Sequence, residues 1–349
     1  MHTIYTDRHH GHATENLVIN GQPIEYRETP ARAETILAAV RAAQLGPIMP
    51  PTDHGLAPIL KAHDADFVTY LRTAYVQGAA HFGEPRPVIA GRDDVTSEHA
   101  PHCPEDFPGR RDYYTYDYED PILEGTWDAA YWSAQCALTA ANLVRSGNGV
   151  RTTNGVCAAY ALCRPPGHHA MPDQYGGFCY LNNVAIAARS LQADGPVAIL
   201  DLDYHHGNGT QAIFYEDPAA LFCSLHADPE WIYPFFWGRT DERGAGVGLG
   251  LNHNWPLPLH MDDVSYLAVL DEALDVIVEF APRYLLVSLG LDAAEGDLIG
   301  KFRITTDGFR EIGRRIAALG LPSVIVQEGG YRIETLGDNA VAFLKAFEA

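Results

Sequence analysis

One segment sets the architecture of this chain: Ile199-Leu200-Asp201-Leu202-Asp203-Tyr204-His205-His206-Gly207-Asn208-Gly209. It continues an apolar run from Val197 to Leu202, which is typical of a buried strand in a parallel sheet. Side chains two residues apart in an extended strand share a side, so Asp203 and His205 point the same way. Zinc accepts both a carboxylate and an imidazole. Asp201 lies on that side too, and this segment alone does not separate its role from that of Asp203.

Helices and strands alternate around this segment. Strands are predicted at 157–163, 197–202, 221–225, 284–289 and 323–327, and helices at 30–43, 127–145, 182–191, 265–280, 307–319 and from about 336. Such alternation predicts a parallel sheet that is covered on both faces. Between residues 80 and 125 the chain is rich in Pro, Gly, Tyr and Asp, which indicates a long inserted loop. We therefore expect one domain over residues 1–349.

The composition restricts the class of protein. With 24 Lys and Arg against 45 Asp and Glu, the formal net charge is −21. This charge argues against a nucleic-acid partner and favours cationic ligands, although acidity can also serve solubility alone. No apolar run approaches the ~20 residues of a membrane helix, and the N-terminal residues do not resemble a secretory signal. The 6 cysteines show no Cys-x-x-Cys spacing, so we expect reduced thiols in a cytoplasmic protein.

Ionisable residues follow every predicted strand, at the edge where parallel sheets carry their sites. Asp292 comes after a strand of almost purely aliphatic residues, where a carboxylate needs a partner. Together with Asp203 and His205 it would provide three metal ligands and leave one open position, as in catalytic zinc sites. Two carboxylates and one histidine are an unusual set for zinc. The alternative is that Asp292 caps a helix.

Two adjacent histidines and a tyrosine complete the set of candidate catalytic residues. His168 and His169 follow Pro-Pro-Gly and suit general acid–base work, with Asp201 and Asn208 as chemically suitable partners. The alternative is a pair of surface histidines in a proline-rich turn. Tyr331 follows Gly-Gly, and its hydroxyl could donate a hydrogen bond to a developing oxyanion, although Gly-Gly-Tyr is also an ordinary turn.

Five motifs occur along the chain in a fixed order: Arg164-Pro-Pro-Gly-His168-His169, Gly176-Gly-Phe-Cys-Tyr-Leu-Asn-Asn183, Asp201-Leu-Asp-Tyr-His-His-Gly-Asn-Gly209, Ser288-Leu-Gly-Leu-Asp292 and Glu328-Gly-Gly-Tyr331. With these motifs the chain resembles the zinc-dependent histone deacetylase superfamily, in the form of its class II branch. Within that branch the size and the inserted loop are most similar to bacterial acetylpolyamine amidohydrolases. The resemblance implies a single arginase/deacetylase-like α/β domain, with a central, mostly parallel eight-stranded sheet and helices on both faces.

The resemblance also implies a role for each matching position. The zinc ligands correspond to Asp203, His205 and Asp292, and iron(II) is the alternative metal. The catalytic groups correspond to His169 as general base and acid, His168 with Asp201 as its charged partner, Asn208 beside His169, and Tyr331 as the carbonyl-polarising hydroxyl. The substrate tunnel corresponds to Gly177, Phe178 and Tyr233. A potassium site corresponds to Asp201, Ser224 and Leu225, with main-chain oxygens of Asp203 and His205.

We expect metal-assisted hydrolysis that releases acetate from a small cationic acetylated amine, with polyamines favoured. The charge of the chain, the acidic-aromatic stretch from Asp112 to Asp120, and Glu15 motivate this choice, since anionic and aromatic groups bind ammonium. Asp112 and Glu15 are therefore the candidate substrate contacts. Alternatives are a protein acetyl-lysine deacylase, a hydrolase of another small amide, a non-catalytic ligand-binding relative, and two-manganese ureohydrolysis. We further expect a homodimer with no nucleic-acid or membrane partner.

Overall fold

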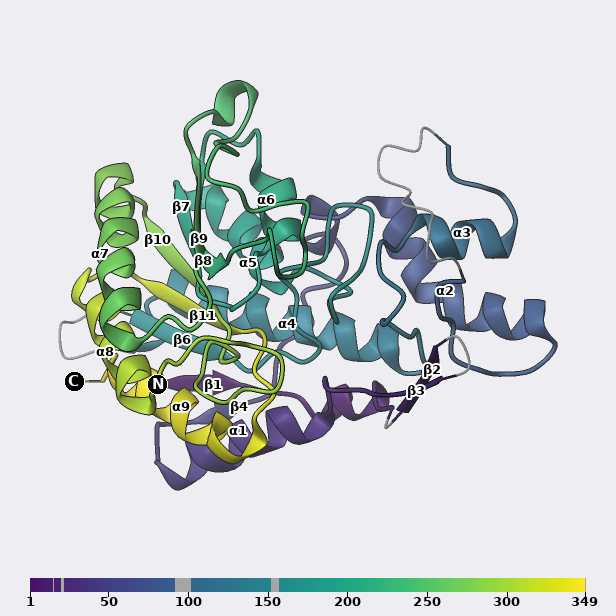
Figure 1. Cartoon of the computed structure of the whole chain (residues 1–349), viewed down its shortest axis with the longest axis horizontal. Helices are drawn as coiled ribbons and strands as arrows, with labels where there is room; N and C mark the ends of the chain where they lie inside the picture. Colours follow the sequence, from purple (N-terminus) through teal and green to yellow (C-terminus); the bar gives the residue numbers. More distant parts are fainter. Residues whose placement is uncertain (15, 20–21, 92–101, 152–156, 349) are drawn as a thin grey trace.

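The computed structural model describes residues 1–14, 16–19, 22–91, 102–151 and 157–348. In these ranges one large sheet organises the chain (Figure 1). Its path runs through β4 (Ile48–Met49), β1 (His2–Ile4), β6 (Cys157–Ala161), β11 (Ser323–Gln327), β10 (Tyr284–Leu289), β7 (Val197–Asp201), β8 (Ala220–Ala227) and β9 (Asn252–Leu257). Every neighbouring pair along this path is parallel.

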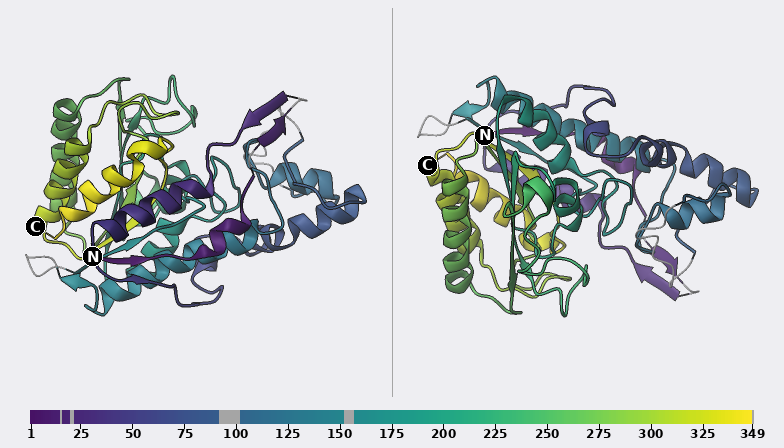
Figure 2. Two further views of the ribbon diagram at one scale, coloured as in Figure 1. Left: turned by 90° about the horizontal axis from the view of Figure 1, so that it is seen from below. Right: turned by 90° about the horizontal axis from the view of Figure 1, so that it is seen from above.

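The prediction of a central, mostly parallel eight-stranded sheet is confirmed, with one addition. A short ninth strand, β5 (Val150–Arg151), pairs antiparallel with β6. A separate antiparallel pair, β2 (Asn16–Ile19) and β3 (Gln22–Glu25), lies at the end of the molecule away from α7 and α8 (Figures 1 and 2).

Strand β7 shows why the sheet is covered on both faces. All its residues are buried, and alternate side chains enter opposite halves of the core. Val197 and Ile199 pack with residues of α4 and α5, while Ala198 and Leu200 pack with residues of α1, α7, α8 and α9. Figure 2 shows helices on the two sides of the sheet. An apolar run without polar alternation is therefore what this central position requires.

The helices have the following bounds: α1 (Pro30–Ala42), α2 (Ala65–Phe82), α3 (Phe107–Tyr113), α4 (Thr126–Arg145), α5 (Asn183–Leu191), α6 (Asn208–Phe214), α7 (Asp263–Phe280), α8 (Thr306–Ala318) and α9 (Ile333–Lys345). Short 3-10 helices occupy Asp7–Gly11, Ile59–Lys61, Gln192–Asp194 and Gly246–Gly248. The predicted inserted loop holds the end of α2 and all of α3. No helix in the described ranges is long and apolar enough to cross a membrane.

Candidate active site

The carboxyl ends of neighbouring strands bring the candidate residues to one edge of the sheet. Strand β7 pairs with β10 in a register that sets Asp201 opposite Ser288, and β10 pairs with β11. The segments that leave these strands therefore begin side by side. They carry Asp203 and His205 after β7, Asp292 after β10, and Tyr331 after β11.

Asp203, His205 and Asp292 form a compact buried cluster. One ligand atom from each lies within 4.8 Å of the others. His205 Nδ1 is 3.3 Å from Asp203 Oδ1 and 3.1 Å from Asp292 Oδ2. Main-chain groups hold the remaining oxygens, because Gly329 N donates to Asp203 Oδ2 at 2.8 Å and Tyr204 N donates to Asp292 Oδ1 at 2.9 Å.

This cluster has the chemistry of a divalent metal site. Burial and the neighbouring Asp203 carboxylate raise the pKa of Asp292 to about 7, a sign of crowded negative charge that a cation would neutralise. The backbone beside the carboxylates must be glycine, since a Cβ at Gly290 would lie 2.2 Å from Asp203 Oδ2 and one at Gly329 would lie 2.6 Å from the same atom. Two carboxylates and one imidazole therefore fit a bound metal ion.

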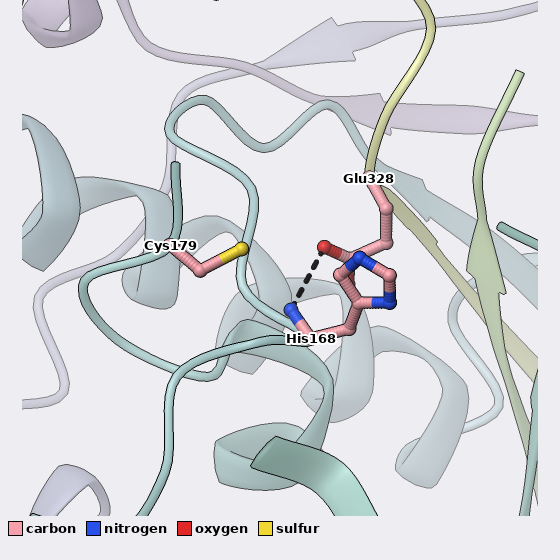
Figure 3. A group of neighbouring side chains, drawn as sticks. All are labelled: His168, Cys179 and Glu328. Carbon is pink, nitrogen blue, oxygen red and sulfur yellow. Dashed lines mark hydrogen bonds between the residues drawn. The ribbon is translucent and has the colours of Figure 1, made fainter. Parts of the chain in front are cut away.

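A second group of possible metal ligands has another role. His168, Cys179 and Glu328 also lie close together, as Figure 3 shows. Glu328 Oε2 accepts hydrogen bonds from Gly167 N at 2.6 Å and His168 N at 3.1 Å. Cys179 Sγ donates to the Gly177 carbonyl at 3.3 Å. The contacts of Glu328 tie the loop after β6 to the end of β11, so Glu328 anchors the histidine pair.

Each imidazole of the pair lies against the acceptor predicted for it. His168 Nδ1 is 3.0 Å from Asp201 Oδ2, and His169 Nδ1 is 2.7 Å from Asn208 Oδ1. Burial works against the charged form of His168, but Asp203 and Asp201 raise its pKa to about 10.

The environment of His169 favours its neutral form. Burial first, then the neighbouring His168 and His205, lower its pKa well below 6.5. Asn208 Nδ2 donates to Tyr116 Oη at 3.3 Å, which orients the amide so that its oxygen accepts from His169 Nδ1. His169 Nε2 is thereby left as the unprotonated nitrogen.

A cavity of about 430 Å³ opens above these residues. His169, His205 and Tyr331 line it together with aromatic side chains of which Phe178 and Tyr233 belong to the predicted tunnel. Gly177, also predicted, lines it at a backbone φ of +59°, and Phe178 has a φ of +67°. A non-glycine residue in this region is strained, and the surrounding contacts must hold it there.

The acidic loop after α3 provides those contacts. Asp117 Oδ2 accepts from Gly177 N at 3.2 Å, and Asp120 Oδ1 accepts from Phe178 N at 2.7 Å. Asp117 and Glu119 also line the cavity. Both residues belong to the acidic-aromatic stretch from Asp112 to Asp120, whose sequence alone does not distinguish them from its other acids.

The structure describes one of the two acidic residues, Asp112 and Glu15, that were predicted to contact the substrate. Asp112 is absent from the described lining residues, because its carboxylate accepts from Arg111 Nε at 2.7 Å and from Gly91 N at 2.9 Å. Glu15 lies outside the described residues. Asp117 and Glu119 are therefore the carboxylates that the described structure offers to a ligand in the cavity.

The residues predicted to bind potassium lie on adjacent strands. Asp201 of β7 is in register with Ser224 of β8, both are buried, and Leu225 follows directly. Ser224 Oγ is 2.8 Å from His226 Nδ1, and Asp201 Oδ1 accepts from Asp203 N at 3.1 Å. Asp201 thus connects this buried region to His168.

Comparisons with known proteins agree with this geometry. Residues 26–347 match the histone deacetylase domain. The chain is 42% identical to acetylpolyamine amidohydrolase 1 of Pseudomonas aeruginosa, over 100% of this chain and 99% of that protein. It is 39% identical to the acetylpolyamine amidohydrolase of Mycoplana ramosa, over 99% of both chains. The crystal structure of the acetylpolyamine aminohydrolase from Burkholderia pseudomallei superposes with a TM-score of 0.91 at 41% identity, over 100% of this chain and 99% of that one. The chain therefore belongs to the histone deacetylase domain family.

Proposed function

We propose that this chain is a zinc-dependent amidohydrolase that removes the acetyl group from acetylated polyamines. One observation carries the proposal: a buried cluster of three candidate metal ligands reaches, through His205, a cavity that is also lined by the His169 imidazole, the Tyr331 phenol and acidic and aromatic side chains. Relatives that match the chain over almost its full length include acetylpolyamine amidohydrolases from Pseudomonas aeruginosa and Mycoplana ramosa, which supports the same reaction.

The catalytic steps follow from the positions of the side chains. The amide carbonyl would lie between the metal ligands and the Tyr331 hydroxyl, which donates a hydrogen bond as negative charge develops on the oxygen. Asp203, His205 and Asp292 would hold the zinc ion, which would supply Lewis acidity and lower the pKa of water towards ~7. His169 Nε2 takes the proton from the attacking water and returns it to the leaving amine. His168, kept charged by Asp201, stabilises the negative charge nearby.

The cavity favours a cationic amine. Asp117 and Glu119 contribute carboxylates, and aromatic rings such as Phe178 and Tyr233 offer faces to an ammonium group. The same catalytic groups would also hydrolyse an acetyl-lysine side chain, so a protein deacylase is the competing candidate.

Substrate comparison tests the assignment. We expect the zinc-loaded protein to turn over N-acetylputrescine and N-acetylcadaverine with a higher kcat/KM than an acetyl-lysine peptide. Preference for the peptide would refute the polyamine assignment. Asp203→Ala, which removes a metal ligand, should abolish turnover of every substrate and serves as the blank.

The metals are tested separately. We expect apoprotein reconstituted with zinc to be active, and a higher activity with iron(II) would identify iron as the alternative. A potassium ion beside Asp201 and Ser224 should appear as a higher melting temperature in KCl than in NaCl at equal ionic strength. Equal melting temperatures in the two salts would contradict the potassium site.

We also propose a cytoplasmic homodimer. Phe236, which lines the cavity, is 72% exposed, and Trp231 is 70% exposed; large apolar side chains so exposed are typical of contact surfaces. All six cysteines, which lie in the described ranges, are free thiols, in keeping with a reducing compartment. Light scattering should give twice the chain mass, and Phe236→Asp should shift the mass towards the monomer.

A further inference from the structure

Asp297 makes a set of contacts that the proposed mechanism does not use. It lies in the segment after β10, and its side chain is buried. One oxygen, Oδ1, accepts from Ile299 N at 2.9 Å and from Gly300 N at 3.1 Å. The other, Oδ2, accepts from Tyr331 N at 2.8 Å and from Arg332 N at 3.0 Å. One carboxylate thus satisfies four main-chain donors from two segments.

Each of the two segments carries a residue that lines the cavity. Ile299 and Tyr331 both line it. A second tie joins the same segments, because Arg332 Nη1 donates to the Glu295 carbonyl at 2.7 Å. The tie is close-packed, since a Cβ at Gly296 would lie 2.3 Å from Arg332 Nη1. The main chain of Tyr331 therefore cannot shift without breaking contacts to the segment that also carries Asp292.

Only a carboxylate suits this position. Each oxygen of an ionised carboxyl group accepts two hydrogen bonds, whereas asparagine has one acceptor oxygen and an amino group that donates. In asparagine the amino group would replace one of the two oxygens. It would then face the two main-chain N–H donors of one segment, which would lose their acceptor. Asp297→Asn therefore keeps the size of the side chain and releases one of the two segments.

We propose that Asp297 is a positioning residue that sets the place of the Tyr331 hydroxyl relative to the metal ligands. This inference rests on the proposed function, in which that hydroxyl polarises the amide carbonyl. Small displacements of such a group lower the rate, because the hydrogen bond must be made to the oxygen as charge develops. Asp297 itself reaches the reaction only through the Tyr331 main chain.

A double-mutant cycle tests the inference. Asp297→Asn should lower kcat by about tenfold or more and change KM by less than about twofold, because the lost contact acts in the transition state. In a Tyr331→Phe background the same substitution should lower kcat by less than about twofold, since the hydroxyl is already absent. Equal losses in both backgrounds would overturn the proposal. If Asp297→Asn does not fold, Asp297→Glu, which keeps the charge, takes its place in the cycle.

The matched control is Asp263→Asn. Asp263 also joins two segments through its carboxylate, because Oδ1 accepts from Thr305 N at 2.9 Å and Oδ2 from Thr305 Oγ1 at 2.6 Å, but it does not line the cavity. This variant should leave kcat unchanged. Metal content and melting temperature are measured for every variant, and a loss of metal from Asp297→Asn would contradict a role confined to Tyr331.

A spectroscopic readout separates this inference from the proposed function. In protein labelled with 3-fluorotyrosine, the ¹⁹F resonance missing from Tyr331→Phe belongs to Tyr331. Asp297→Asn should shift or broaden that resonance, and Asp263→Asn should not. An unchanged resonance in Asp297→Asn would refute the positioning role even if the chain hydrolyses acetylated amines. Absence of turnover in the unsubstituted protein would refute the proposed function, but the ¹⁹F resonance would still show whether Asp297 positions Tyr331.

Discussion

The guanidinium group of Arg32 lies over the ring of Tyr331, with 4.7 Å between Cζ and the ring centroid. Arg32 Nε also donates to the Gly330 carbonyl at 2.5 Å, and Nη2 donates to the Glu328 carbonyl at 2.7 Å. Glu28, which is fully buried, accepts from Arg32 Nη1 at 2.7 Å. Helix α1 thereby holds the turn that carries the candidate catalytic phenol.

The first prediction concerns Arg32. Lysine cannot make these separate contacts, because its ammonium is a point charge and not a planar fork. We expect Arg32→Lys to lower kcat by about tenfold with unchanged metal content. Arg32→Met should lower the free energy of unfolding by about 1–3 kcal/mol, since Glu28 loses one buried partner and keeps Arg164, whose Nε lies 2.8 Å from Glu28 Oε1. Steady-state kinetics and urea unfolding measure the two effects.

A surface arginine provides the control for Arg32. Arg310 pairs with Asp307 in the first turns of α8, and both side chains are exposed. Exposed ion pairs contribute about 0–1 kcal/mol, so Arg310→Lys should change neither kinetics nor stability noticeably. An Arg32→Lys variant that behaves like Arg310→Lys would show that the stacking on Tyr331 has no functional consequence.

The second prediction concerns removal of the metal. Asp203, Asp292 and His205 are buried with their ligand atoms facing one another, so the metal-free protein retains uncompensated negative charge. We expect chelation to lower the melting temperature and to lower kcat by about 10³-fold or more. The reason is that polarisation of the substrate carbonyl by the metal stabilises the transition state by several kcal/mol. Added zinc should restore both. A chelated protein with full activity would exclude the metal-assisted mechanism.

The central strands could be predicted closely because each is a short, almost uninterrupted apolar run, which is typical of a buried strand. The run Tyr284–Leu289 is apolar except for Ser288, and β10 has these bounds. Strand β9 was not predicted. It carries Asn252 and Asn254, whose amide nitrogens donate to Gln211 Oε1 at 3.0 and 2.8 Å. Polar side chains that are satisfied inside the fold leave no apolar pattern in the sequence.

Some residues of the candidate site could likewise be predicted from the sequence, and others could not. Residues that follow apolar strands, such as Asp203 and Asp292, could be singled out because a carboxylate there needs a partner. Arg32 and Asp297 could not, since their partners are main-chain atoms hundreds or tens of residues away. Nor could the sequence show which acid of the stretch from Asp112 to Asp120 reaches the cavity, because the direction of each side chain depends on how α3 ends.

The third prediction concerns acid stability and His63. This buried imidazole lies 2.9 Å from the Met171 carbonyl through Nδ1, and its Nε2 accepts from Asn182 N at 2.8 Å, so the folded protein needs the neutral form. Burial lowers its pKa from 6.5 to about 4. Its contribution is therefore present above pH 6.5 and is lost as the pH falls towards 4, by about 3 kcal/mol in total.

Urea unfolding at several pH values measures this contribution. His63→Gln should be less stable than the unsubstituted protein at neutral pH, and the difference between the two should shrink as the pH falls from 6.5 towards 4. His10 is a suitable control, because its side chain is exposed and its contact is a surface pair with Glu34. A constant difference between His63→Gln and the unsubstituted protein would contradict the prediction.

The last prediction concerns the acidic wall of the cavity. Glu119 lines the cavity, while its main-chain N–H donates to Asp117 Oδ1 at 2.9 Å, so the backbone of the loop does not depend on the Glu119 side chain. Glu119→Gln should therefore remove charge without moving Phe178. We expect KM for N-acetylputrescine to rise by about three- to tenfold, in line with the loss of a partly exposed ion pair of about 1 kcal/mol.

A neutral substrate of the same length separates charge from shape. N-acetylbutylamine lacks the distal ammonium, so its KM should be the same for Glu119→Gln and the unsubstituted protein. Raising the salt concentration should weaken binding of N-acetylputrescine to the unsubstituted protein more than to the variant, since screening acts only on the charge that Glu119 supplies. Equal changes in KM for both substrates would show that Glu119 shapes the cavity without recognising the ammonium group.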